Sequence, residues 1–208
     1  MSLNLVNPFM KFASGGGDPV FYRQLAKASG TGTTITTPSF DPSESLMILM
    51  STHSGGSAAT ACYQFNTDTG SNYANRFSTN GGADNTSQTN RDRILNGSGF
   101  ANASAFAVGF VGNLETKEKL VISNSIENGG NGANAPNRRQ VVGKWANTSS
   151  EITTASLFEQ DGNGWGATSE IVVLGTASGG DTVWEQLSST TVTSGSSIDS
   201  GTISNKKY

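Results

Sequence analysis

The sequence has few of the residues that carry metal, redox or acid–base chemistry. Among 208 residues there is one cysteine, Cys62, and one histidine, His53. A single cysteine excludes an internal disulfide framework and a zinc cluster held by several thiolates. A single imidazole leaves little for metal binding or for general acid–base catalysis. We therefore expect no metal, no other cofactor and no enzymatic activity.

Charged and apolar side chains are also scarce. Charged residues make up 14% of the chain and apolar residues 34%, both below the averages of globular domains, and the net charge is −3. The apolar run at residues 46–50 is far too short to span a bilayer. The first twelve residues lack the basic start and apolar stretch of a signal peptide. A mildly acidic balance with scattered cations argues against nucleic-acid binding. We thus expect neither a membrane nor a nucleic acid as partner.

Small polar residues take the place of the missing ones. Gly (26), Ser (28), Thr (23) and Asn (19) together make up 46% of the chain. This composition resists long helices and favours short strands joined by many turns. About ten short strands are expected, at residues 33–40, 46–52, 62–65, 73–77, 91–95, 105–111, 119–123, 138–145, 152–158 and 170–174. Their spacing predicts an all-β fold, a jelly-roll-like antiparallel β-sandwich over residues 21–176.

Residues 1–20 differ from the rest and are expected to form an extended N-terminal arm. Apolar side chains dominate its first part, and four glycine or serine residues at 14–17 provide a flexible joint. One interpretation is a segment that packs on its own domain. The alternative is an arm that docks on a neighbouring subunit or another partner. For the second, the candidate contact residues are Leu5, Pro8, Phe9 and Phe12.

The end of the chain repeats its beginning. With one inserted residue, Gly, Gly, Asp, Val, Gln and Leu of residues 16–25 recur at residues 179–187. With a compensating gap, Ile35 matches Ile198 and Phe40 matches Ile203. A repeat at domain length indicates tandem copies of one unit. Residues 177–208 are therefore interpreted as a linker and the start of a second, incomplete copy. We favour a chain that continues into a second sandwich; the alternative is strand addition to a neighbour's sheet.

Candidate chemical sites are weak. No Gly-x-Ser-x-Gly motif surrounds a serine, and His53 is expected at a strand end beside a turn. Two loops, at residues 66–72 and 161–164, place oxygen ligands at intervals that calcium uses, but Asx-type turns explain both more simply. Trp165 stands between glycines, so its ring is a possible surface contact for a glycan; packing onto its own sandwich is the favoured interpretation.

Several motifs resemble a β-domain that recurs in virion structural proteins of tailed bacteriophages, especially phages of cyanobacteria and other aquatic bacteria. The motifs cover about residues 21–175: FNTDTGSNYANRFSTNGG at 65–82, KEKLVI at 117–122, APNRR at 135–139, VGKWANT at 142–148 and GATSEIVVLG at 166–175. The resemblance implies a sandwich on the virion surface, often oligomeric, with no catalytic residues to transfer. Such domains are found in capsid decoration (cement) proteins and in tail and fibre proteins.

The resulting functional hypothesis is a capsid decoration protein on the outside of the virion. Its expected partners are the major capsid protein and further copies of itself, with a trimer favoured. The first alternative is a tail or fibre domain that binds host glycans. A second, with less support, is a surface depolymerase, for which no acid–base pair can be named.

Overall fold

A computed structural model describes residues 22–97, 104–128 and 132–176. The N-terminal arm and the C-terminal repeat lie outside these residues. The described part folds into strands without a helix. The strands are β1 (Tyr22–Gly32), β2 (Thr34–Thr36), β3 (Ser45–His53), β4 (Ala61–Phe65), β5 (Tyr73–Thr79), β6 (Asn85–Arg91), β7 (Ile94–Leu95), β8 (Ser104–Gly112), β9 (Lys119–Glu127), β10 (Asn137–Trp145), β11 (Ala155–Glu159) and β12 (Trp165–Thr176). In this part of the chain, no helix exists that could cross a membrane.

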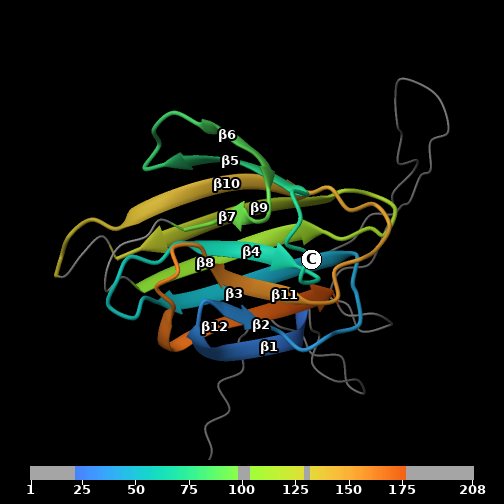
Figure 1. The fold of residues 1–208 in the computed structure, drawn as a ribbon, viewed down its shortest axis with the longest axis horizontal. Coiled ribbons are helices and arrows are strands. Elements are labelled where there is room, and N and C mark those ends of the chain that lie inside the picture. The colour runs from blue at the N-terminus through green and yellow to red at the C-terminus, as the bar shows by residue number, and fades with distance from the viewer. Residues whose placement is uncertain (1–21, 98–103, 129–131, 177–208) are drawn as a thin grey trace, which may run out of the picture. The chain divides into compact units, whose positions relative to one another are not determined.

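The strands form two antiparallel sheets. The larger sheet has eight strands in the order β1-β12-β3-β8-β9-β10-β5-β6, and the smaller has four in the order β2-β11-β4-β7. In Figure 1 the smaller sheet lies across one face of the larger sheet. The core fills the space between them. This arrangement confirms the all-β antiparallel sandwich expected from the sequence.

The core forms because one side of each central strand is apolar. In β3 alternate side chains point inward, and Leu46, Ile48 and Met50 are almost fully buried. Such alternation is what a half-buried strand requires. Between the sheets lies a cluster of aromatic rings from β4 of the smaller sheet and from β5 and β10 of the larger one. Within it the rings of Tyr73 and Trp145 are stacked, with centroids 6.2 Å apart.

Two strands at the sheet edges were missed by the sequence analysis. β1 (YRQLAKASGTG) buries only Ala26, and β6 (NTSQTNR) contains no apolar residue. Edge strands of this kind are held by backbone pairing on one side and carry no inward apolar pattern to detect. The strand expected at residues 91–95 is divided between the end of β6 and the short β7. The one expected at 152–158 begins only at Ala155.

The residues that define the repeat have a clear role in the first copy. Ile35 and Phe40 are buried in the core, and Leu25 packs against it. Their matches at Leu187, Ile198 and Ile203 lie outside the described residues.

Candidate functional site

In β9 the row of side chains that faces the core is mostly polar and the row that faces water is mostly apolar, which is the reverse of an ordinary surface strand. Its inward row contains Lys119, Val121, Ser123, Ser125 and Glu127, and all five are buried. Its outward row contains Leu120, Ile122, Asn124 and Ile126, and the three apolar ones are 61%, 60% and 53% exposed. A strand normally turns its apolar row to the core and its polar row to water. β9 thus exposes side chains that would ordinarily be covered.

The neighbouring strands extend this exposed surface. Phe106 and Phe110 of β8 stand directly opposite Ile126 and Ile122 of β9. On the other side, Val142 of β10 also stands opposite Ile122. Directly opposed side chains of an antiparallel pair lie on one face of the sheet. We call this surface the outer apolar face and define it by six residues: Phe106, Phe110, Leu120, Ile122, Ile126 and Val142.

The size of the outer apolar face sets it apart from scattered surface residues. Its six side chains are 44–61% exposed. Aromatic side chains such as Phe106 and Phe110 offer roughly 150–250 Å² each, and with the four aliphatic side chains the apolar surface open to water is on the order of several hundred Å². The largest patches on monomeric proteins reach about 300–600 Å² and commonly mark interaction sites. The face therefore has the properties of a binding surface.

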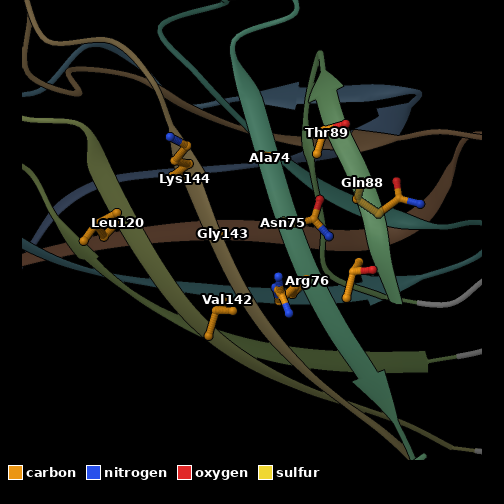
Figure 2. A pocket seen from close by; sticks show the side chains of 10 residues that line it. Ala74, Asn75, Arg76, Gln88, Thr89, Leu120, Val142, Gly143 and Lys144 are labelled. Atoms are coloured by element: carbon orange, nitrogen blue, oxygen red, sulfur yellow. The ribbon is translucent and has the colours of Figure 1, made fainter. Parts of the chain in front are cut away.

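Shallow hollows accompany the face along its length. One of about 340 Å³ lies between β10, β5 and β6, and Figure 2 shows Leu120, Val142, Arg76 and Lys144 around it. Another of about 310 Å³ lies at the opposite end, beside Phe106 and Ile126. Such relief suits the insertion of side chains from a partner. The lining of the first hollow is mostly carbon, which matches an apolar occupant better than a polar metabolite.

Buried polar residues explain why the inward row of β9 tolerates serines. The Ser123 hydroxyl lies 3.0 Å from the Tyr63 hydroxyl and 2.6 Å from Oδ1 of Asn96. The Ser125 hydroxyl donates to the Asn96 carbonyl at 2.6 Å. Burial raises the pKa of the Tyr63 phenol, although hydrogen bonds from Ser123 and Asn96 oppose the shift. Mutual hydrogen bonding offsets the cost of removing these groups from water.

Gly109 on β8 gives the Tyr63 ring room to reach this network. A Cβ atom at residue 109 would lie 2.7 Å from the Tyr63 hydroxyl oxygen. The absence of a side chain on β8 is therefore what allows the tyrosine of the smaller sheet to contact Ser123 of the larger one.

Lys119 is buried at one end of the inward row. Its ammonium group donates to the backbone carbonyls of Glu115, Lys117 and Asn147 at 2.8–3.1 Å, and it lies 5.9 Å from the centroid of the Trp145 ring. Burial lowers the pKa of this lysine, and nearby carboxylates partly oppose the shift. The lysine thus ties the loop before β9 and the loop after β10 to the sheet through their backbone carbonyls.

The loop at residues 66–72, whose oxygen ligands are spaced as in calcium sites, is a structural turn. Oδ1 of Asp68 accepts from the backbone N–H of Gly70 at 2.8 Å, which is the hydrogen bond of an Asx turn. Oδ2 accepts from Asn72 Nδ2 at 3.0 Å and from Trp145 Nε1 at 2.7 Å. Burial acts to raise the pKa of Asp68, but the hydrogen bonds from Trp145, Asn72 and Gly70 lower it overall. Both carboxylate oxygens are engaged within the protein, as the turn interpretation predicts.

The second calcium-like loop is organised by the buried carboxylate of Glu159. Its two oxygens accept from the backbone N–H groups of Thr60, Asp161, Asn163 and Gly164 at 2.6–3.3 Å. Four donors around one carboxylate compensate its burial. Within residues 22–97, 104–128 and 132–176, no group of three or more His, Cys, Asp or Glu side chains could hold a metal ion.

The nearest approach to a nucleophile and base is the pair His53 and Ser104. Nδ1 of His53 lies 2.9 Å from Oγ of Ser104, at the ends of two adjacent strands and open to solvent. Activation of a serine also requires a group that orients the imidazole. Among the described residues, no carboxylate is hydrogen-bonded to this ring. The pair therefore fits the predicted strand-end histidine and carries no site.

The structure corrects the glycan-contact hypothesis for Trp165. Its side chain is 4% exposed and belongs to the hydrophobic core. The favoured alternative, packing onto its own sandwich, is confirmed. Gly166 allows a close approach to β3: a Cβ there would lie 3.0 Å from the His53 ring and 3.2 Å from the His53 carbonyl oxygen. The ring is not available to stack on a sugar.

Two arginines, Arg93 and Arg139, have partners within the fold. Arg139 lies over the Phe77 ring, 4.4 Å from its centroid, and donates to the Gly97 carbonyl. Arg93 pairs with Asp92 and lies 4.6 Å from the centroid of the Phe158 ring. Both cations are used in packing.

The candidate contact residues of the N-terminal arm, Leu5, Pro8, Phe9 and Phe12, lie outside the described residues. The outer apolar face was missed by the sequence analysis, although its signal is present. Residues 119–127 (KLVISNSIE) alternate with a period of two, which predicts a strand, but the pattern alone does not say which row faces the core.

Compared with protein-family models, curated proteins and solved structures, the chain matches none of them.

Proposed function

We propose that the chain is a non-enzymatic structural protein of a bacteriophage virion, a decoration protein that binds the outer capsid surface and stabilises the shell. The observation that supports this role best is the outer apolar face. A surface of that size is suited to a protein that works inside an assembly. The motifs at 65–82 and 135–148 support the same class of protein through their resemblance to virion β-domains.

In the proposed mechanism the protein acts by binding alone. Apolar contacts contribute roughly 25 cal/mol per Å² of surface removed from water. Each copy bridges capsid subunits, and many copies act together so that the shell resists internal pressure. The proposed oligomer is a trimer at local threefold positions, with the major capsid protein as partner. Leu5, Pro8, Phe9 and Phe12 would anchor the N-terminal arm to the capsid or to sister subunits.

The alternative, a glycan-binding tail or fibre domain, has lost its candidate residue, because Trp165 is buried. The two roles still differ in a quantity that is simple to measure. A decoration protein occupies the shell in hundreds of copies, whereas a tail component is present in a handful. Quantitative mass spectrometry of purified virions, scaled to the major capsid protein, therefore separates them.

A binding experiment tests the proposal directly. Purified protein is added to capsids that lack decoration, and occupancy is measured by cosedimentation and electron microscopy. We expect saturable binding to the outer surface and greater resistance of the shell to heat. A variant without residues 1–13 should decorate poorly. Full occupancy by this variant would remove the anchoring role of the arm, and absence of binding by the intact chain would overturn the decoration role.

A further inference from the structure

We infer that the outer apolar face is the binding site for the N-terminal segment, residues 3–12, of a neighbouring copy of the chain. This inference rests on the proposed function, because decoration places identical copies side by side. It goes further by naming the surface that receives the arm. The result would be an oligomer linked by exchanged arms.

The chemistry of the two surfaces is complementary. Residues 3–12 contain seven apolar side chains and a single charged one, Lys11. On the receiving side, the outward row of β9 is uncharged from Leu120 to Ile126, and its one polar member is Asn124. On β10, uncharged Gln140 stands opposite Asn124, whereas Lys144 and Arg138 stand opposite Leu120 and Ile126 at the two ends of the row, and Lys144 is ion-paired with Glu118. Burying an apolar segment on this face therefore leaves no charge of β9 without water.

The strand register places the start of β1 at a suitable end of the sheet. Tyr22 pairs with Thr176 of β12, and Gly175 beside it pairs with Leu46 of β3. Leu46 pairs in turn with Val111, and Val111 pairs with Val121 of β9. β1 thus begins level with Leu120, at one end of the outer apolar face.

The length of the connection is sufficient for exchange. Four strand spacings separate β1 from β9, which corresponds to about 19 Å. The nine residues from 13 to 21 can span up to about 30 Å when extended. Their reach exceeds the distance from the sheet edge to the face. An arm that leaves β1 is therefore long enough to cross from the edge of a sheet to such a face.

Exchange between copies fits the proposed role better than a segment folded on its own sheet. In exchange, the donor surface and the receiving surface are different patches, which makes the contact heterologous. Heterologous contacts form rings such as trimers where the rotation between copies closes, and open filaments where it does not. A segment folded on its own sheet would cover the same apolar area but would leave the copies unlinked.

Cross-linking between two variants tests the exchange. One preparation carries Leu5→Cys, Phe9→Cys or Phe12→Cys, and the other carries Ile122→Cys; they are mixed and treated with a short bifunctional thiol reagent. The native Cys62 is buried, which limits its reaction. We expect a covalent dimer with at least one arm position. The matched control is Thr34→Cys, an exposed residue on β2 of the other sheet, which should give little product.

Three outcomes would overturn the inference. They are equal cross-linking to Thr34→Cys, no cross-linking by any arm position, and a product confined to one chain when both cysteines are placed in the same molecule. The result is independent of the capsid experiment. A protein that decorates capsids without exchange contradicts this inference alone, whereas a protein that exchanges arms in solution but does not bind capsids contradicts the decoration role alone.

Discussion

The indole Nε1 of Trp145 donates a 2.7 Å hydrogen bond to the carboxylate of Asp68, and this bond joins a surface loop to the aromatic core. Trp145 lies at the end of β10 and is 1% exposed, while Asp68 belongs to the loop between β4 and β5. The same carboxylate closes the Asx turn with Gly70. One side chain therefore sets both the shape of the loop and its position on the core.

Replacing this carboxylate should destabilise the fold in a pH-dependent way. For Asp68→Asn we expect a loss of about 1–3 kcal/mol at pH 7, because hydrogen bonds to a charged group are lost. The pKa of Asp68 is lowered in the folded protein. Its contribution is therefore present above the ordinary pKa of an aspartate and is lost as the pH falls through the lowered folded-state value.

Urea unfolding at a series of pH values measures this effect. The difference between wild type and Asp68→Asn should shrink as the solution is acidified. Asp84→Asn, at an exposed position, serves as the control and should change little. A gap that stays constant down to strongly acidic pH would show that the charge of Asp68 does not matter.

Gly109→Ala should destabilise the protein, because the new methyl group would overlap the Tyr63 hydroxyl. Overpacking of this kind costs about 1–3 kcal/mol. Gly112→Ala on the same strand is the matched control, since no atom lies within 4 Å of its added Cβ. Thermal unfolding of both variants measures the difference. The double variant Gly109→Ala with Tyr63→Phe should lose less than the sum of the single changes; strict additivity would contradict the steric explanation.

Lys119→Met should also weaken the fold. The change keeps most of the side-chain volume but leaves three backbone carbonyls without their shared donor. Because the three bonds share one ammonium group, we expect a total loss of about 1.5–3 kcal/mol, the range typical of hydrogen bonding to a charged group. Denaturant unfolding provides the measurement, with exposed Lys117→Met as the control. Equal stability of the two variants would show that the buried ammonium contributes nothing.

Ile122→Asp should prevent self-association while leaving the sandwich intact. The side chain is 60% exposed, so a charge there costs the isolated fold little, but it would be buried when an arm docks. Light scattering after gel filtration should give a smaller species than wild type, with unchanged circular dichroism. Asn124→Asp adds the same charge on the same row without removing an apolar side chain, and it should weaken association less. An oligomer that survives Ile122→Asp would exclude this face as the interface.

The sandwich could be predicted from the sequence because its composition favours turns and its central strands are apolar. Two features could not be predicted. β1 and β6 carry no inward apolar pattern, and which row of β9 faces the core depends on Tyr63 and Asn96, which are distant in sequence. For Trp165 the flanking glycines left a surface position open as an alternative, but the favoured interpretation, packing in the core, is the observed one. In the fold Gly166 lies close to the backbone of His53 and Ser54 at the end of β3, and Ser54 forms an isolated β-bridge with Trp165.

The inverted alternation of β9 also affects how this strand reaches its correct alignment with β8 and β10 during folding. Moving β9 by one residue relative to β8 and β10 would turn Leu120, Ile122 and Ile126 inward. Hydrophobicity alone would therefore favour the wrong alignment of this strand. The polar contacts of Ser123 with Tyr63 and Asn96, together with the carbonyls around Lys119, are satisfied only in the observed alignment. Hydrogen bonding of the buried polar groups thus selects the observed alignment during folding, at the strand whose outward surface would be covered in the proposed assembly.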